Sequence, residues 1–324
     1  MRMVELVGAA AAGSRVSVPI DGTDQVDLVR RWAEATGNTV LVVHDQAVDL
    51  VRGRVEDPIR ALPPEARPGH RLWLYTNLHC NLACDYCCVS SSPHAAPRIL
   101  SAAEVRRLVD EATDLGTREL YLTGGEPFLR PDIDEVIGIA TGSLPTTVLT
   151  NAMVWTGRRR DLLERLDREG LTLQVSLDGA SGELHDLHRG AGSFARALTG
   201  VRTAISLGFR VRLAATLAAD AEDAAQQVLD LAERLGLDPE EQLIRRVARQ
   251  GAASDGLVVS RASLVPEVCA TADGFWWHPL VALDPAMRVA DPGASLDQVI
   301  SEVRDEYRAF RLEGDLLAHT FPCA

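Results

Sequence analysis

Three cysteines at a short spacing are the residues of this sequence best suited to chemistry. Cys80, Cys84 and Cys87 stand in TNLHCNLACDYCCVSSSP as a C-x₃-C-x₂-C pattern. Thiolates are the usual ligands of iron–sulfur clusters, and a compact loop lets three of them converge on one cubane. Three protein ligands for a cubane of four irons leave one iron open to an outside ligand, as reactive metal sites require.

Neighbouring residues allow two alternatives to this ligand set. Cys88 lies next to Cys87 and could replace it, but the x₂ spacing favours Cys87 and leaves Cys88 as a small buried residue. His79 or His94 could instead complete a structural zinc site with the cysteines.

Further polar residues and glycines follow three later candidate strands. They are Gly124, Gly125, Glu126 and Pro127, then Thr150 and Asn151, and then Ser176, Asp178 and Arg189. Two adjacent glycines allow backbone to approach a ligand closely, and the carboxylate of Glu126 can bind an ammonium group.

The cysteine pattern, with the aromatic Tyr86 before its last cysteine, resembles the signature loop of the radical S-adenosylmethionine (SAM) superfamily. GGEP resembles the family motif that binds the SAM amino group, Ser176 with Arg189 resembles its ribose and carboxylate contacts, and TNA at 150–152 is similar to its TNG. A zinc site would not explain this order of motifs over roughly residues 70–250. The resemblance is closest to the SPASM/twitch-type branch.

The resemblance implies an enzyme with one [4Fe–4S] cluster that cleaves SAM reductively. The resulting 5′-deoxyadenosyl radical abstracts hydrogen from a substrate, while the protein orients that substrate and excludes water. An electron donor such as flavodoxin or ferredoxin is implied as well. No acid or base is assigned, because His185, Asp186 and His188 are typical of a polar helix start. A non-catalytic Fe–S sensor is disfavoured by the intact GGEP.

The elements that must position these residues alternate regularly from Arg71 onward. Short apolar runs, the candidate strands, alternate with amphipathic helical stretches, several of which end in Gly. The runs span 72–77, 119–125, 146–151, 171–179, 210–217 and 242–248. Such alternation requires parallel strands with right-handed crossovers. We therefore expect an α/β fold with a partial (β/α)₆ TIM barrel over 67–250 and its functional groups at the carboxyl ends of the strands.

Smaller units are expected on both sides of the barrel. Residues 1–66 predict a β-α-β-β unit of α+β type, followed by a Pro-rich linker at 57–69. Residues 251–324 predict a hairpin around an Asp-Gly turn and then a helix, a cap that could close the open side of the barrel. Trp276 and Trp277 alternate in this hairpin. Core packing is expected for both, and the alternative is that one of them faces the barrel mouth and lines the substrate cavity.

The C-terminal region resembles a SPASM/twitch extension that is poor in cysteine. Only Cys269 and Cys323 are available there, with His278 near the position of a further cysteine, whereas an auxiliary cluster normally takes four ligands. A degenerate cap with Cys269 as a buried hydrophobe is favoured over an unusual auxiliary cluster, and a disulfide is least favoured.

Composition indicates which partners and which cellular compartment to expect for this protein. A net charge of −13 without a block of like charge argues against nucleic-acid binding. Glu5 interrupts the apolar start, and no membrane-length apolar run follows, so a cytoplasmic protein without a membrane partner is expected. The substrate is expected to be a peptide or other natural product, or alternatively a small sugar, nucleoside or cofactor precursor.

Overall fold

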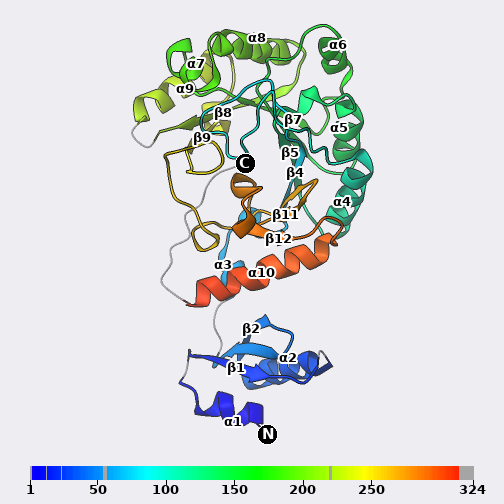
Figure 1. Ribbon diagram of the computed structural model, residues 1–324, viewed down its shortest axis with the longest axis vertical. Helices are drawn as coiled ribbons and strands as arrows, with labels where there is room; N and C mark the ends of the chain where they lie inside the picture. Colours follow the sequence, from blue (N-terminus) through cyan, green and yellow to red (C-terminus); the bar gives the residue numbers. More distant parts are fainter. Residues whose placement is uncertain (1, 12, 23, 54–56, 219–220, 314–324) are drawn as a thin grey trace.

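A computed structural model of the chain describes residues 2–11, 13–22, 24–53, 57–218 and 221–313. Its main feature is one curved sheet with helices along its outer face (Figure 1). A separate three-stranded sheet formed by the N-terminal residues lies beyond the last helix.

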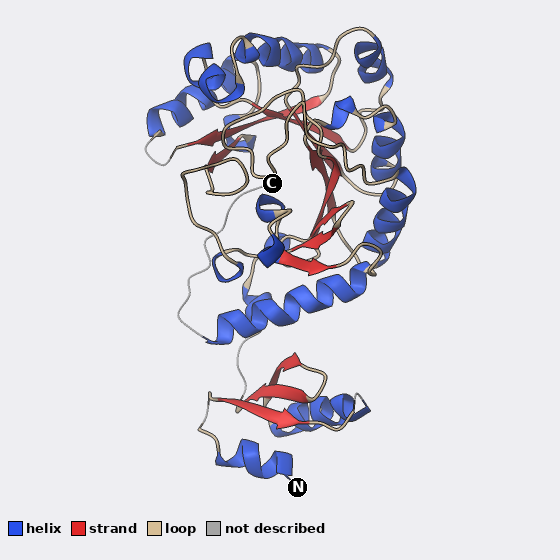
Figure 2. Ribbon diagram, in the orientation of Figure 1, coloured by secondary structure: helices blue, strands red, loops and turns tan. Residues whose placement is uncertain are grey.

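Six parallel strands form the central part of the large sheet. They are β4 (Arg71–Asn77), β5 (Glu119–Gly124), β6 (Thr146–Thr150), β7 (Leu171–Ser176), β8 (Arg210–Leu217) and β9 (Leu243–Arg246). Each pairs with the next in chain order, and the sheet curves as an open arc without closing (Figure 2). The expected α/β fold with a partial barrel is therefore confirmed, and its strands lie where the apolar runs predicted them.

Helices cover the outer face of this arc. They are α4 (Ala102–Asp114), α5 (Ile133–Thr141), α6 (Arg158–Arg165), α7 (Gly182–Arg189), α8 (Ser193–Ser206) and α9 (Glu222–Arg234). In α4, Ser101 caps the first turn by accepting a hydrogen bond from the Glu104 N–H at 3.2 Å, and Val105 and Leu108 face the sheet.

Successive side chains of each strand point to opposite faces of the sheet, so the barrel has an outer and an inner hydrophobic core. In β4, Leu72 and Leu74 are buried against the helices, while Trp73 and Tyr75 point into the barrel interior. The Trp73 ring stacks on Tyr121 of β5, with 4.3 Å between ring centroids. The outer core is therefore mainly aliphatic, and the inner core at β4 and β5 is rich in aromatic residues.

The C-terminal hairpin extends the barrel sheet. Strand β10 (Cys269–Thr271) pairs antiparallel with β11 (Gly274–Trp276) and parallel with β4, and β11 also pairs with β12 (Arg288–Ala290). The expected hairpin is present, but it lengthens the arc beyond β4 instead of closing it, because β12 and β9 remain the two ends of the sheet.

The N-terminal unit contains the expected β-α-β-β elements. These are β1 (Arg15–Pro19), α2 (Asp24–Thr36), β2 (Thr39–Val43) and β3 (Ala47–Val51). They are preceded by α1 (Arg2–Ala9), a helix that was not expected from the sequence. The strands form an antiparallel sheet in the order β1-β3-β2.

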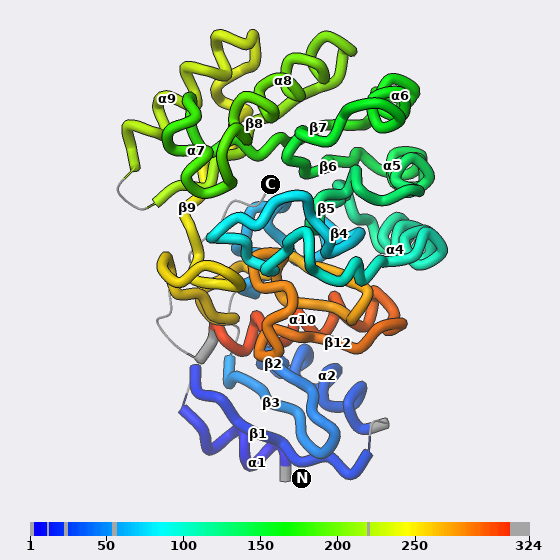
Figure 3. The backbone as a smooth tube through the Cα atoms, turned by 45° about the horizontal axis from the view of Figure 1, so that its top comes forward, coloured from blue at the N-terminus to red at the C-terminus, as the bar shows by residue number. Residues whose placement is uncertain are grey.

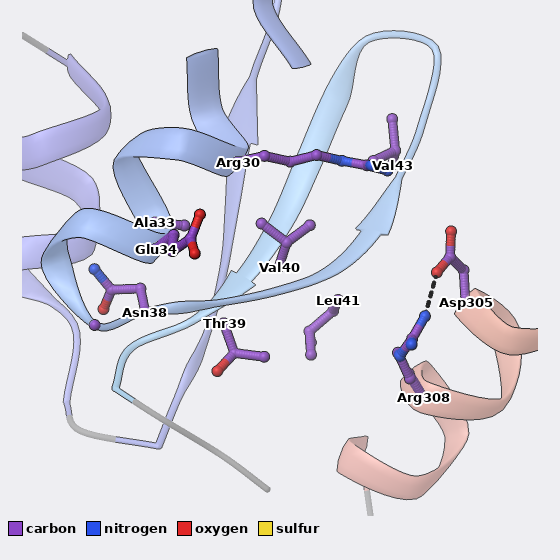
Figure 4. Close-up of a pocket in the computed structure, with 11 residues that line it drawn as sticks. Arg30, Ala33, Glu34, Asn38, Thr39, Val40, Leu41, Val43, Asp305 and Arg308 are labelled. Atoms are coloured by element: carbon purple, nitrogen blue, oxygen red, sulfur yellow. Dashed lines mark hydrogen bonds and ion pairs between the residues drawn. The ribbon is translucent and has the colours of Figure 1, made fainter. Parts of the chain in front are cut away.

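Helix α10 (Leu296–Glu313) lies between this unit and the barrel (Figure 3). A cavity of about 440 Å³ lies between α2, β2 and α10. Figure 4 shows Arg30 and Leu41 on one side of it and Asp305 and Arg308 on the other. Arg308 also bonds to Asp57, at 3.0 Å, in the segment expected to be a linker. That segment is thus attached to α10 and includes the short helix α3 (Pro58–Ala61). None of the helices described here is long and apolar enough to cross a bilayer.

Two helix glycines give a test of the packing beneath the barrel rim. A Cβ at Gly200 of α8 would lie 2.0 Å from the Ala152 carbonyl oxygen, whereas a Cβ at the exposed Gly138 of α5 would meet no described atom within 4 Å. We expect Gly200→Ala to lower the free energy of unfolding by roughly 1–3 kcal/mol through overpacking. Gly138→Ala should raise it by about 0.5–1 kcal/mol through helix propensity. Anaerobic denaturant titration would measure both, and equal effects of the two substitutions would contradict this packing.

Candidate active site

The three cysteines lie in the loop that follows β4 and line one cavity. Cys80, Cys84 and Cys87 all contribute to a cavity of about 180 Å³, together with residues from the carboxyl ends of β5 to β9. Cys80 is buried, and Cys84 and Cys87 are half-buried. The structure thus places the candidate ligands at the rim where barrel enzymes hold their functional groups.

Backbone N–H groups point toward two of these sulfur atoms. The Leu82 N–H contacts Cys80 Sγ at 3.4 Å, and the Ser91 N–H contacts Cys87 Sγ at 3.3 Å. Burial raises the pKa of the Cys80 thiol to about 12, so a metal must displace its proton. N–H donors directed at sulfur stabilise a thiolate ligand once it has formed.

The same thiols suit a cluster better than a single ion. Among the described residues, no three His, Cys, Asp or Glu side chains are gathered closely enough to hold one metal ion. A [4Fe–4S] cluster instead takes one thiolate at each of several corners of a cube. Three cysteines around one cavity, with sulfur-directed donors, therefore fit the cluster.

The two glycines of GGEP contact the cysteine loop itself. A Cβ on Gly124 would lie 2.2 Å from the Asn77 carbonyl oxygen, and one on Gly125 would lie 2.1 Å from that of His79. The Gly125 N–H bonds to the Asn77 oxygen and the Glu126 N–H to the His79 oxygen, both at 2.9 Å. Both glycines also line the cavity, so the space saved by their missing side chains admits the backbone just before Cys80.

Glu126 is fully buried beneath this contact. Its carboxylate accepts hydrogen bonds from the Thr150 hydroxyl at 2.8 Å, the Asn151 N–H at 2.8 Å and the Phe128 N–H at 3.2 Å. Burial raises the pKa of Glu126 to about 7 although these donors oppose the shift. In this geometry Glu126 ties the end of β5 to the end of β6, and the adjacent Pro127 is buried at the start of a 3₁₀ turn.

Thr150 and Asn151 line the cavity as well. The Asn151 amide donates to Asn81 Oδ1 at 2.8 Å, which links β6 to the cysteine loop. Ala152, at the place of the glycine in TNG, has a φ of 58°, in the left-handed region that favours glycine.

Asp178 organises the wall formed by β7 and β8. Its buried carboxylate accepts from Arg189 Nε at 2.5 Å, from the Tyr86 hydroxyl and from the Thr216 N–H at 2.9 Å. Burial alone would raise the pKa of Asp178, but the Arg189 guanidinium and these donors hold it below its usual value. Ser176, Arg189, Tyr86 and Thr216 line the cavity, so Asp178 positions groups that face it.

The polar residues of α7 support this wall. His185 is buried and its Nδ1 accepts from the Asp178 N–H at 3.1 Å, while burial lowers its pKa to about 4. Asp186 accepts from the N–H groups of Gly192 and Phe194 at the start of α8. His188 Nδ1 lies 2.9 Å from Asp85 Oδ2 in the cysteine loop.

Some contacts of the loop were not predicted. A Cβ on Gly251, whose φ is +59°, would lie 2.3 Å from the Cys87 carbonyl oxygen, so the chain after β9 packs directly on the cysteine loop. Arg245 and Arg246 of β9 line the cavity. In the sequence, the close approach of Gly251 to Cys87 is indicated only by a glycine followed by small residues.

Residues 75–232 match the model of the radical SAM superfamily. The chain carries a radical SAM domain. The match begins in β4 and ends in α9, so it includes the cysteine loop and the ends of β5 to β8. A radical SAM domain uses a [4Fe–4S] cluster and SAM.

Curated relatives match the same domain. An AdoMet-dependent heme synthase of Methanosarcina barkeri is 32% identical over 160 residues, which cover 48% of this chain and 45% of that protein. A PqqA peptide cyclase of Ruegeria pomeroyi is 33% identical over 159 residues, 48% of this chain and 42% of that protein. The alignments thus span less than half the length of these relatives.

Solved structures share the fold of the radical SAM domain. Streptococcus suis SuiB bound to its precursor peptide SuiA has a TM-score of 0.51 at 19% identity, covering 60% of this chain and 43% of that one. Native anSMEcpe with AdoMet and a Cp18Cys peptide has a TM-score of 0.54 at 11% identity, covering 73% and 81%.

The C-terminal candidates lie apart from the cavity of the radical SAM domain. Cys269 is buried among Trp73, Tyr75 and Trp276, and Cys323 lies outside the described residues. His278 is buried, and its Nδ1 accepts from the Leu280 N–H at 3.1 Å. Trp276 packs in the barrel interior and Trp277 in the outer core, as expected for core residues. Neither is among the described residues that line the cavity.

The charge of Asp178 should be essential for this wall. We expect Asp178→Asn to lower the free energy of unfolding by about 3 kcal/mol or more, because it leaves the Arg189 guanidinium buried without its counter-ion. The effect should be constant between about pH 6 and pH 8, since the carboxylate of the folded protein stays ionised throughout that range. Glu164→Gln, in an exposed pair with Arg160, should change stability by no more than about 0.5 kcal/mol. Similar losses in both variants would refute this role.

Proposed function

We propose that the protein modifies a peptide or other natural product by radical chemistry, with hydrogen abstracted from the substrate at the cavity described above. The observation that carries this proposal is the arrangement of Cys80, Cys84 and Cys87 around one cavity with strand-end polar groups. When bound, the cluster and SAM supply a 5′-deoxyadenosyl radical for hydrogen abstraction.

Residues of this chain bind and orient the cofactors. We propose that Gly124, Gly125, Thr150, Asn151, Ser176 and Arg189 contact SAM, since all of them line the cavity. Glu126, Pro127 and Asp178 belong to the same proposed site and support it from buried positions. The apolar cluster of the barrel interior reaches the cavity through Leu149 and Leu280, which would help to exclude water there.

A second depression supports a substrate larger than a metabolite. A groove of about 660 Å³ adjoins the cavity and shares Tyr86 and Arg246 with it. Residues 253–257 form one side of this groove, and Leu257 is exposed there. An extended peptide could lie in the groove and present one residue to the cavity.

The relatives agree with a peptide substrate. A PqqA peptide cyclase is among the curated relatives, and both solved structures described above hold a peptide. The similarity to AdoMet-dependent heme synthases supports a second candidate, an enzyme that acts on a cofactor precursor.

The proposal extends to the setting of the reaction. A low-potential donor such as flavodoxin or ferredoxin would supply the electron, and a cytoplasmic location would keep the described cysteines in the reduced state. Residues 1–66, 67–250 and 251–324 would act as an N-terminal domain, the radical SAM barrel and a C-terminal cap with no cluster of its own.

Iron content tests the number of clusters. We expect the anaerobically reconstituted protein to hold about four irons per chain, and the combined Cys80, Cys84 and Cys87 to Ala variant to hold none. Iron and sulfide analysis with the visible absorption spectrum gives both numbers, and Cys269→Ala serves as the matched control that should retain the cluster. About eight irons would refute a cap without a cluster, and iron retained by the triple variant would refute the ligand assignment.

Isotope transfer tests the substrate class. We expect dithionite-reduced enzyme to form 5′-deoxyadenosine from SAM, and deuterium from a labelled candidate peptide to appear in it, because the radical takes hydrogen from the substrate. Mass spectrometry of the nucleoside measures the transfer. Label that comes only from small metabolites would favour the second candidate, and absence of SAM cleavage would refute the enzyme assignment.

A further inference from the structure

Arginines supply the charge of the side chains that line the catalytic cavity. Arg189, Arg245 and Arg246 border it, and no Asp or Glu is among the described residues that do so. Arg189 already forms an ion pair with Asp178, with 2.5 Å between Arg189 Nε and Asp178 Oδ2. Arg246 is exposed and also borders the adjoining groove.

The direction of Arg245 follows from strand register. In the parallel pair of β8 and β9, Arg245 is the partner of Thr216, which also lines the cavity. Its neighbour Ile244 packs on the outer face near Val228 of α9. Successive side chains of a strand point to opposite faces, so Arg245 points into the barrel.

The guanidinium of Arg245 keeps hydrogen-bonding capacity inside the barrel. Its Nε atom is buried without a hydrogen-bond partner among the described residues. The ionisable groups that act on it electrostatically include Glu267 and Cys88. The Glu267 carboxylate accepts from Trp73 Nε1 at 2.6 Å and lies 3.7 Å from Arg71, so it is already engaged. Arg245 is half-buried, and a cation with an unpaired buried donor favours an anionic ligand.

We propose that Arg245 binds a carboxylate of the substrate. In a peptide this would be an acidic side chain or the C-terminal carboxylate, and the inference rests on the function proposed above. Arg245 lies on β9, beside the groove, whereas the proposed SAM contacts lie at the ends of β5 to β7 and on α7. The planar guanidinium matches a carboxylate through two parallel hydrogen bonds, which a lysine cannot reproduce.

A matched pair of probes tests this assignment. The α-amides of N-acetyl-L-glutamate and N-acetyl-L-glutamine differ only in that the first carries one carboxylate and the second carries none. Calorimetric titration of each α-amide into the cluster-bearing enzyme with saturating SAM would compare their affinities. We expect the wild-type enzyme to prefer the glutamate probe by about tenfold, since hydrogen bonds to charged groups contribute on that order. Arg245→Gln should abolish the preference, and Arg245→Lys should retain part of it.

Controls separate this proposal from its alternatives. Arg210→Gln removes an exposed arginine of β8 that pairs with Glu241, and it should keep the full preference. Loss of SAM binding in Arg245→Gln with iron content intact would assign the arginine to the SAM carboxylate and overturn the proposal. Equal affinity of wild-type enzyme for both probes, or no binding of either, would also overturn it. SAM cleavage by the wild-type enzyme is measured separately, so failure of the proposed function would be recognised by itself.

Discussion

The backbone at the end of β5 touches the backbone that leads into the cysteine loop, and the rest of the site depends on this contact. It requires positions 124 and 125 to lack side chains, because a Cβ at either would come within 2.2 Å of a carbonyl oxygen. Gly251 makes a comparable contact from the chain after β9. The loop that carries the three thiols is therefore held from both sides by backbone, whose position varies less than that of a flexible side chain.

A buried network of charge fixes the opposite wall. Asp178 joins Arg189, Tyr86 and Thr216, which come from a helix, the cysteine loop and a strand. An ion pair of this kind contributes little net stability, because desolvation offsets most of the attraction. It does specify geometry, since each partner loses hydrogen bonds if it moves. The site thus combines rigid backbone on one side with a directed charge network on the other.

Each strand contributes side chains to the outer core and to the barrel interior. Their outward side chains are mainly aliphatic and pack on the helices. Their inward side chains include the stacked rings of Trp73 and Tyr121 in β4 and β5 and the hydrogen-bonded pair of Gln174 and Arg212 in β7 and β8. The polar residues that line the cavity follow at the carboxyl ends, so a single sheet provides both a packed core and a site for chemistry.

The sequence by itself determined the features that depend on near neighbours in the chain. The spacing of the cysteines, the six apolar runs and the glycines at helix ends all express local periodicity or local backbone freedom, and the α/β fold followed from them. Proximity of distant segments depends on the path of the whole chain instead.

Only the tertiary structure brought Gly251 onto Cys87, placed Ala152 in a left-handed conformation against Gly200 and joined the C-terminal hairpin to β4. It likewise directed Arg245 toward the cavity and left both tryptophans of the hairpin away from it. These arrangements follow from strand register and steric fit between residues far apart in the chain, which spacing along the sequence does not encode.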